Sequence, residues 1–275
     1  LGLSQDEIAR GIAAYKVMGR RGALWTGTGI NLVDDSYNAN PDSMRCAIES
    51  ISDMPGRHVC VLGDMLEMGP EAASMHYELG RYAVEKGMER FGRIDILVNN
   101  AGYGCITNFE ETRESSIKDM FEVNVFGMMR VTRAVLPIMR KQRSGHIFNI
   151  SSGAGYSAGP VPYHTSKFAV TGFSTSLAFE VEPFGIKVTN VAPGLFRTGF
   201  YDKGTWRTVP DIHIEDYDSN RWQNAFVKDA DRREQPGDPD KLAKLIIEVS
   251  NSENPPLHLP VGADAPQGID SLCAK

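Results

Sequence analysis

The sequence predicts an α/β protein with a doubly wound, mainly parallel sheet that helices cover on both faces. Short apolar runs of strand length alternate with longer amphipathic stretches, the pattern of parallel sheets with helical crossovers. No repeat or low-complexity segment interrupts this alternation. The 275 residues, 41% hydrophobic and 23% charged, have an ordinary globular balance and suffice for one large or two small domains.

Composition narrows the classes of function. A formal net charge of −6 argues against general nucleic-acid binding, which usually requires a basic surface. The sequence has no apolar run long enough to span a bilayer and no signal peptide, so we expect no membrane association and a cytoplasmic location. The four cysteines lack a CxxC pair or a histidine at ligand spacing, so no metal site is expected: Cys46, Cys60, Cys105 and Cys273.

The first third of the chain predicts a capped helix, a hairpin-like pair and further α/β elements. Ser4 has the position of a helix cap, and Pro41 lies near the first turn of a helix opened by Asn40. The expected elements are a helix after Ser4, a strand pair within Trp25–Val33, a helix from Asn40, a strand at His58–Leu62 and a helix at Pro70–Lys86.

The rest of the chain continues the alternation. Strands are expected at Ile94–Val98, His146–Ile150, Ile186–Val191 and, as an extended segment, Pro255–Val261. Helices are expected as one long helix within Ser115–Arg140, at Tyr163–Pro183 and at Asp240–Val249. The variable segment Phe200–Arg233 is expected to form a lid, and its aromatic residues allow an apolar substrate.

The pair Tyr163 and Lys167 carries the clearest chemistry. Positions i and i+4 share a face of a helix, so the two side chains should point the same way. An ammonium group one turn away favours the phenolate and should lower the tyrosine pKa from its usual value near 10. Such a tyrosine can exchange a proton with a carbonyl or alcohol oxygen. Alone, the pair also fits an exposed tyrosine covered by a lysine stem.

Polar or small residues end the neighbouring strands, in order. Asn99–Gly102 closes one strand, Ser151–Ser152 the next, and Pro193–Gly194 the third, with Thr198 just beyond. Asn124 lies on the helix between the first two strands. Ligands bind at the carboxyl ends of strands in such sheets, so we expect these residues to surround one site.

This arrangement resembles the short-chain dehydrogenase/reductase family, with a Rossmann-like sheet, from about Met88 to the end of the chain. The resemblance implies a nicotinamide cofactor, NAD or NADP, with a small alcohol or carbonyl substrate, and association into homodimers or homotetramers through the long helices. The motifs that carry it are NNAG (Asn99–Gly102), NVFG (with Asn124), NISS (with Ser152), YHTSK (Tyr163–Lys167) and PGLFRT (Pro193–Thr198).

The resemblance also implies roles for these residues. Tyr163 would be the acid/base, with Lys167 lowering its pKa and holding the nicotinamide ribose. Ser152 would hydrogen-bond the substrate oxygen, and Asn124 would anchor a water of the proton relay. The other cofactor contacts would be Asn100, Ala101 and Gly102 on the adenosine side and Pro193, Gly194 and Thr198 at the nicotinamide end.

Two features depart from that family's pattern. Ser152 and Tyr163 are eleven positions apart, about two fewer than expected, and Ser151 competes for the serine role although it should face the other side of the chain. The strand, glycine-rich turn and helix that would hold the cofactor diphosphate are missing upstream of Ile94. Thr26–Ile30 reads as a turn, and bulky residues separate Gly63 from Gly69.

Leu1–Gly87 instead resembles the C-terminal domain of the Mur ligases, most closely the enzyme that adds D-alanyl-D-alanine to the cell-wall nucleotide precursor. The matching motifs are Gly19–Arg20, DDSYNANPDSM (Asp34–Met44), VLGDMLEMG (Val61–Gly69) and His76 with Gly80. The resemblance implies that Arg20, Asp35, Asn38 and Asn40 lie near ATP or the substrate nucleotide; read locally, the same run is a helix-start loop with capping residues. The central ATPase domain with its phosphate loop is missing, so ligase activity would need a separate chain.

We therefore predict a chimeric chain that joins the two patterns near Gly87–Met88, the first part supplying the first strands of a common sheet. Three hypotheses follow: an oxidoreductase using Tyr163 and Lys167, a catalytically inactive chimera with a vestigial nucleotide cleft, and a ligase domain acting with a partner. Three histidines are interpreted as surface or capping residues: His146, His164 and His213.

Overall fold

A computed structural model describes residues 4, 23–26, 31–34, 40–52, 71–201, 206–218 and 235–265. The chain divides into two compact units, Leu1–Leu79 and Gly80–Lys275. The helix α3 (Ala72–Phe91) runs without interruption through both this boundary and the predicted junction at Gly87–Met88. We describe each unit by itself.

The first unit contains a β-hairpin and a capped helix. Strands β1 (Ala23–Thr26) and β2 (Asn31–Asp34) pair antiparallel, which confirms the predicted hairpin. Helix α2 (Pro41–Ser52) begins after Asn40, whose Oδ1 accepts from the Ser43 amide at 2.9 Å, as in a capping box. The predicted helix after Ser4 and the strand His58–Leu62 lie outside the described residues.

The prediction that this unit supplies strands to a common sheet is wrong for β1 and β2. They form a separate two-stranded sheet. The length of their connection accounts for the antiparallel pairing: four residues, 27–30, separate the two strands, whereas a parallel crossover needs a dozen residues or more.

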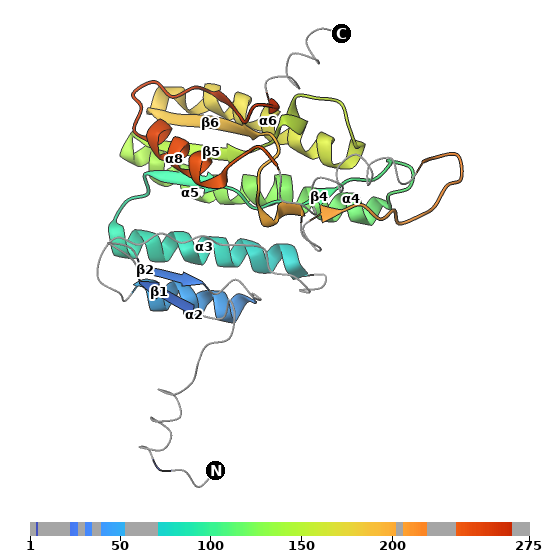
Figure 1. Ribbon diagram of the computed structural model, residues 1–275. Coiled ribbons are helices and arrows are strands. Elements are labelled where there is room, and N and C mark those ends of the chain that lie inside the picture. Colours follow the sequence, from blue (N-terminus) through green and yellow to red (C-terminus); the bar gives the residue numbers. More distant parts are fainter. Residues whose placement is uncertain are drawn as a thin grey trace. The chain divides into compact units, whose positions relative to one another are not determined.

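The second unit is built on a four-stranded, fully parallel sheet in the order β3-β5-β6-β8 (Figure 1). Its strands are β3 (Ile96–Asn99), β5 (Gly145–Ile150), β6 (Ile186–Pro193) and β8 (His258–Val261). Its α-helices beyond α3 are α4 (Glu114–Phe121), α5 (Met128–Gln142), α6 (Val161–Val181) and α8 (Pro239–Ser250). Short elements are β4 (Gly104–Cys105), β7 (Trp206–Arg207) and the 3-10 turns η3 (Gly153–Gly155), η4 (Glu182–Phe184) and η5 (Gly199–Tyr201).

Helices cover both faces of this sheet, as the sequence predicted. On one face, Ile147 of β5 packs against residues of α5 and α6, including Met139 and Leu177, with Leu97 of β3 at the margin. On the opposite face, Phe148 packs against Val249 of α8. Neighbouring residues of β5 thus point to opposite layers, because side chains alternate along a strand.

The long helix expected around Asn124 is interrupted. A π-helical turn, η2 (Glu122–Gly127), separates α4 from α5. A single such turn inside a helix is rare, and it often marks a functional site. Here it carries Asn124 into the interior, where the side chain is buried.

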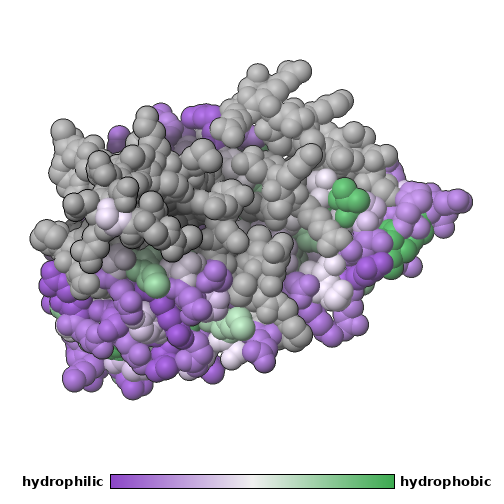
Figure 2. Space-filling view, turned by 90° about the horizontal axis from the view of Figure 1, so that it is seen from below, coloured by the Kyte–Doolittle hydropathy of each residue, from purple (hydrophilic) through white to green (hydrophobic). Residues whose placement is uncertain are grey.

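The surface is mostly polar where it can be seen. On the face shown in Figure 2, hydrophilic residues dominate the described part, with hydrophobic residues at scattered positions. Within the described ranges, no helix is both long and apolar enough to cross a membrane.

Candidate active site

Tyr163 and Lys167 lie on one face of α6 and are both buried, with exposed fractions of 7% and 5%. The Lys167 Nζ atom is 5.7 Å from the centroid of the Tyr163 ring. The i, i+4 spacing therefore produces the predicted juxtaposition. Which role each side chain takes stays a prediction.

The Lys167 ammonium is held by a backbone carbonyl. Its Nζ donates to the carbonyl oxygen of Ile150, the last residue of β5, at 3.0 Å. Burial lowers the pKa of Lys167 to about 8, because the charged form loses solvation. An ammonium has three hydrogens, so two more remain to donate to a ligand.

The expected lowering of the Tyr163 pKa is wrong for this structure. Burial raises the pKa of Tyr163 to about 12, and a hydrogen bond with the Ser152 side chain offsets only part of that rise. The ring lies in an apolar cluster that includes Ile106 and Met120, and the Phe200 ring centroid is 6.0 Å away. Removal from water disfavours the phenolate more than nearby groups favour it.

The two adjacent serines separate as extended backbone requires. Ser152 is hydrogen-bonded to Tyr163, and its Oγ also accepts from the Ala154 amide at 3.1 Å, which caps η3. Ser151 points the other way, and its Oγ donates to the Lys167 carbonyl at 3.1 Å. The geometry thus favours Ser152 over Ser151 as the serine that meets a substrate.

The short loop between Ser152 and Tyr163 lies tightly against α6. A side-chain carbon on Gly155 would lie 2.6 Å from Thr171 Oγ1 and 2.8 Å from the Lys167 carbonyl oxygen. Only glycine allows this approach, so the loop that looked two residues short is closely fitted to the helix that carries Tyr163.

Asn124 joins three segments of the site. Its Oδ1 accepts from the Tyr103 amide at 3.0 Å, and its Nδ2 donates to the Tyr103 carbonyl at 2.9 Å. The same Nδ2 lies 3.2 Å from Ser166 Oγ on α6. The side chain therefore fixes the chain after β3, and its predicted part in a proton relay remains a prediction.

The turn after β3 ends beside Asn124 and Lys167. A side-chain carbon on Gly102 would lie 3.1 Å from Asn124 Oδ1 and 3.6 Å from Lys167 Nζ. The preceding residues Asn100 and Ala101 are exposed. The structure therefore brings Gly102 beside the buried lysine and asparagine, whereas the cofactor contacts of Asn100 and Ala101 stay a prediction.

The turn after β6 is held by a residue that the sequence reasoning missed. Asp264 Oδ2 accepts from the Leu195 amide at 2.8 Å, and a side-chain carbon on Gly194 would lie 2.1 Å from Asp264 Oδ1. The Gly194 amide donates to the Val261 carbonyl at 2.8 Å. Asp264 is 70 positions from Gly194 in the chain, so no local pattern signals the contact. Thr198 is exposed, and its Oγ1 accepts weakly from Phe200.

The described residues fit the nicotinamide and ribose half of a dinucleotide. Lys167 Nζ has hydrogens for a ribose diol, and Gly102 leaves open the space that a side chain would fill beside it. Asp264 Oδ1 is a buried acceptor without a donor at the Gly194 turn. The described ranges contain no glycine-rich diphosphate turn; the weak candidates at residues 27–30 and 63–69 lie outside them.

The histidine interpretation needs one correction. His146 on β5 is buried, with Nε2 2.9 Å from Thr189 Oγ1, and burial lowers its pKa to about 4. β5 is an inner strand of a sheet that helices cover on both faces, so the middle residues of this strand, His146 among them, are buried whichever face they point to. His164 bonds the Ser157 carbonyl through Nδ1 at 2.7 Å, and the His213 side chain is exposed.

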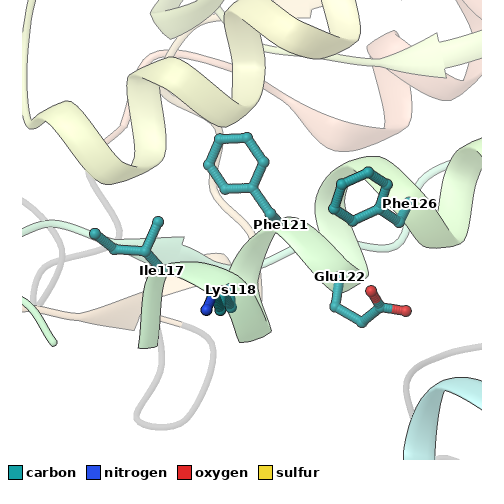
Figure 3. A pocket seen from close by; sticks show the side chains of 5 residues that line it. All are labelled: Ile117, Lys118, Phe121, Glu122 and Phe126. Carbon is teal, nitrogen blue, oxygen red and sulfur yellow. The ribbon is translucent and has the colours of Figure 1, made fainter. Parts of the chain in front are cut away.

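Two further features of the described part of the chain concern metal ligands and a pocket away from Tyr163. No group of three His, Cys, Asp or Glu side chains there could hold a metal ion. A pocket of about 410 Å³ opens on α4 and η2, lined mainly by apolar side chains (Figure 3). It contains none of the predicted site residues: its lining is Ile117, Lys118, Phe121, Glu122 and Phe126.

Comparison with known proteins assigns the class. Residues 74–206 match the family model described as short chain dehydrogenase, and residues 20–91 match the one described as Mur ligase, glutamate ligase domain. Together with the relatives below, these matches show that the chain belongs to the short-chain dehydrogenase family and carries a Mur-ligase-like segment before it. Both sequence resemblances are confirmed.

Individual relatives are oxidoreductases. Oxidoreductase BOA17 of Botryotinia fuckeliana is 41% identical over 189 residues, which make up 66% of each chain. A 3-ketodihydrosphingosine reductase of Bacteroides thetaiotaomicron is 40% identical over 187 residues, 66% of this chain and 68% of its own. The chain thus spans about two thirds of the length of these curated relatives.

Solved structures agree on the fold. A short-chain dehydrogenase from Streptomyces avermitilis is 39% identical with a TM-score of 0.61, covering 72% of this chain and 73% of that one. A gluconate 5-dehydrogenase from Burkholderia cenocepacia, solved with NADP and tartrate, is 25% identical with a TM-score of 0.54, covering 70% and 72%.

Proposed function

We propose that this chain is an oxidoreductase that interconverts an alcohol and a ketone or aldehyde with a nicotinamide cofactor. One observation carries the proposal: the Tyr163 hydroxyl is enclosed, hydrogen-bonded to Ser152 and one helical turn from the Lys167 ammonium. Family membership supports it, and the Bacteroides relative is named for the reduction of a 3-keto compound.

The chain's own residues would manage the proton. When bound, the nicotinamide ring supplies a hydride to the carbonyl carbon or accepts one from the alcohol carbon. In reduction, Tyr163 donates its phenolic proton to the oxygen as the carbonyl electron pair moves onto it. Ser152 donates a hydrogen bond to that oxygen, and the Lys167 ammonium stabilises the remaining phenolate.

The surroundings of Tyr163 bear on its protonation state and on the polarity of the substrate. Burial raises the pKa of Tyr163 to about 12, so the phenol is protonated at neutral pH and carries the proton that reduction consumes. The surroundings of the ring are apolar, so the substrate should be uncharged near its carbonyl: the cluster holds Cys105, Ile106, Met120, Ala154 and Phe200.

NAD or NADP is the proposed cofactor, and nothing in the described part chooses between them. Lys167 would hold the nicotinamide ribose. The adenosine side would meet Asn100, Ala101 and Gly102, and the nicotinamide end would meet Pro193, Gly194 and Thr198. The gluconate 5-dehydrogenase of the same fold holds NADP, which supports this class of cofactor.

The domain division is also a proposal. We propose that the Mur-ligase-like segment ends and the dehydrogenase-like segment begins near Gly87–Met88. Both family matches cover residues 74–91, and that stretch lies within α3. A junction inside one continuous helix preserves its hydrogen bonds, so the two patterns can share it without a linker.

The test follows cofactor oxidation with a panel of uncharged ketones and aldehydes. The full chain should oxidise NADH or NADPH, and Tyr163→Phe should reduce the rate at least 100-fold, since it removes the proton donor. Tyr77→Phe makes the same chemical change at a 47% exposed position and should leave the rate unchanged. Equal rates for the wild type and Tyr163→Phe would refute the assignment.

A catalytically inactive chimera is the second candidate. It is favoured by the partial span of the relatives and by the missing diphosphate turn in the described ranges. Absence of NADH or NADPH binding at millimolar concentration, measured by fluorescence and melting temperature, would establish it. ATP binding before Gly87 would instead support the ligase hypothesis. Light scattering would decide whether the chain forms the predicted homodimer or homotetramer.

A further inference from the structure

Residues 206–218 form a strap that is attached to the loop 107–113 at several points. At its start, β7 pairs in parallel with β4, Gly104 with Trp206 and Cys105 with Arg207 (Figure 1). Further along, two strap amides, those of Asp211 and Ile212, donate to the backbone carbonyl of Glu111 at 3.0 and 3.1 Å. The strap therefore depends on a single residue of the facing loop for its central contacts.

The Glu111 side chain is the buried part of this attachment. Only 1% of the residue is exposed, although glutamate is among the residues that are rarely buried. Its Oε1 accepts from the Ile214 amide of the strap at 3.1 Å, and its Oε2 accepts from Asn108 Nδ2 at 2.7 Å. Both carboxylate oxygens are thus used, one toward the strap and one toward the loop.

Three further contacts between strap and loop each involve at least one exposed side chain. The Arg113 amide donates to Asp211 Oδ2 at 2.9 Å, and the Tyr217 hydroxyl donates to Glu110 Oε2 at 3.1 Å. His213 Nδ1 lies 3.8 Å from Glu111 Oε1. Exposed polar contacts contribute little to stability, whereas a buried charge that loses a partner is costly.

The strap borders the proposed active site. Cys105, which pairs with the strap, is buried in the same cluster as Tyr163. The Phe200 ring, which precedes the strap in the chain, lies beside the Tyr163 ring. A shift of the strap would therefore change the wall next to the acid/base.

We propose that Glu111 is a positioning residue whose buried carboxylate latches the strap to the loop and so fixes one wall of the substrate site. That this wall faces a substrate rests on the proposed function; the latch itself does not. A carboxylate suits the position because it accepts from two donors at once. An amide of the same shape would turn an NH2 group toward one of them.

Hydrogen exchange of the full chain tests the latch. In Glu111→Gln, peptides from residues 206–218 should exchange at least tenfold faster, because the amide has one acceptor oxygen for two donors, the Ile214 amide and Asn108 Nδ2, and the strap opens locally. Peptides from β5 should be unaffected. The matched control Glu110→Gln alters the adjacent exposed carboxylate and should change strap exchange less than twofold.

A double variant distinguishes loss of the Glu111 hydrogen bonds from general destabilisation of the fold. In Glu111→Gln with Asn108→Asp, the new amide can donate to the new carboxylate while its oxygen still accepts from Ile214. Exchange of the strap should then return to within about threefold of wild type. Asn108→Asp alone places two carboxylates together and should speed exchange as Glu111→Gln does.

The outcomes are decisive in either direction. Unchanged strap exchange in Glu111→Gln, or a double variant no slower than the single one, would overturn the latch. If the wild type reduces ketones, Glu111→Gln should raise KM at least fivefold with kcat less affected. If KM is unchanged although the strap is loosened, the wall assignment is overturned. A wild type without activity would refute the proposed function and the wall, and exchange would still decide the latch.

Discussion

Replacing Asn124 with alanine should destabilise the second unit by about 2–5 kcal/mol. The side chain is 2% exposed and makes three hydrogen bonds, two to the Tyr103 backbone and one to Ser166. Its loss would remove one hydrogen bond each from the Tyr103 amide and carbonyl, at about 1–3 kcal/mol for each of these part-buried groups. The π-helical turn, which these bonds hold in place, should relax toward a regular helix.

Urea unfolding followed by far-ultraviolet circular dichroism would measure the change. The midpoint of the transition that removes helical signal should fall, and the slope should stay the same if only stability has changed. Asn251→Ala is the control, because this exposed side chain makes one bond, to the Ile247 carbonyl, and its loss should cost less than about 0.5 kcal/mol. A loss below about 1 kcal/mol for Asn124→Ala would refute the reasoning.

The remaining predictions concern His146, two glycines and their neighbours. Burial lowers the pKa of His146 to about 4, so the fold prefers neutral imidazole; stability should be full above pH 6.5 and decline as the pH falls toward 4. In His146→Gln the melting temperature should fall less than in the wild type as the pH decreases from 6.5 to 4. Equal falls in the two proteins would contradict this prediction. Gly194→Ala should destabilise by about 1–3 kcal/mol, because the new carbon would meet the Asp264 carboxylate at 2.1 Å. Gly172→Ala, inside α6 with nothing within 4 Å, should instead stabilise by about 0.5–1 kcal/mol; thermal melts of both variants would show whether the signs differ.

The chain carries motifs of two families, and each motif can have a structural role of its own. The motifs are the strand-end residues of the second unit and the run of residues before α2. Asn40 shows how such a motif acts within this chain, since its side chain caps α2 through Ser43. A residue implied at a nucleotide site in the Mur ligases therefore has a local structural role here.

Much of the second unit could be read from the sequence alone. Strand and helix order follows from apolar runs and helical spacing, and these are local properties of the chain. The juxtaposition of Tyr163 and Lys167 follows from the pitch of one helix, and the opposite directions of Ser151 and Ser152 follow from extended backbone. The cofactor class and the substrate class came from family resemblance rather than from spacing.

Only the tertiary structure decided how the surroundings act on these residues. The pKa of Tyr163 rises instead of falling because segments from four other parts of the chain enclose its ring, and desolvation depends on everything nearby. Asp264 beside Gly194 and Glu111 beside Ile214 are contacts between positions 70 and 103 residues apart. A sequence pattern records periodicity over a few turns, whereas such contacts depend on how whole elements pack, so the sequence determined the order of the elements and packing determined the chemistry between them.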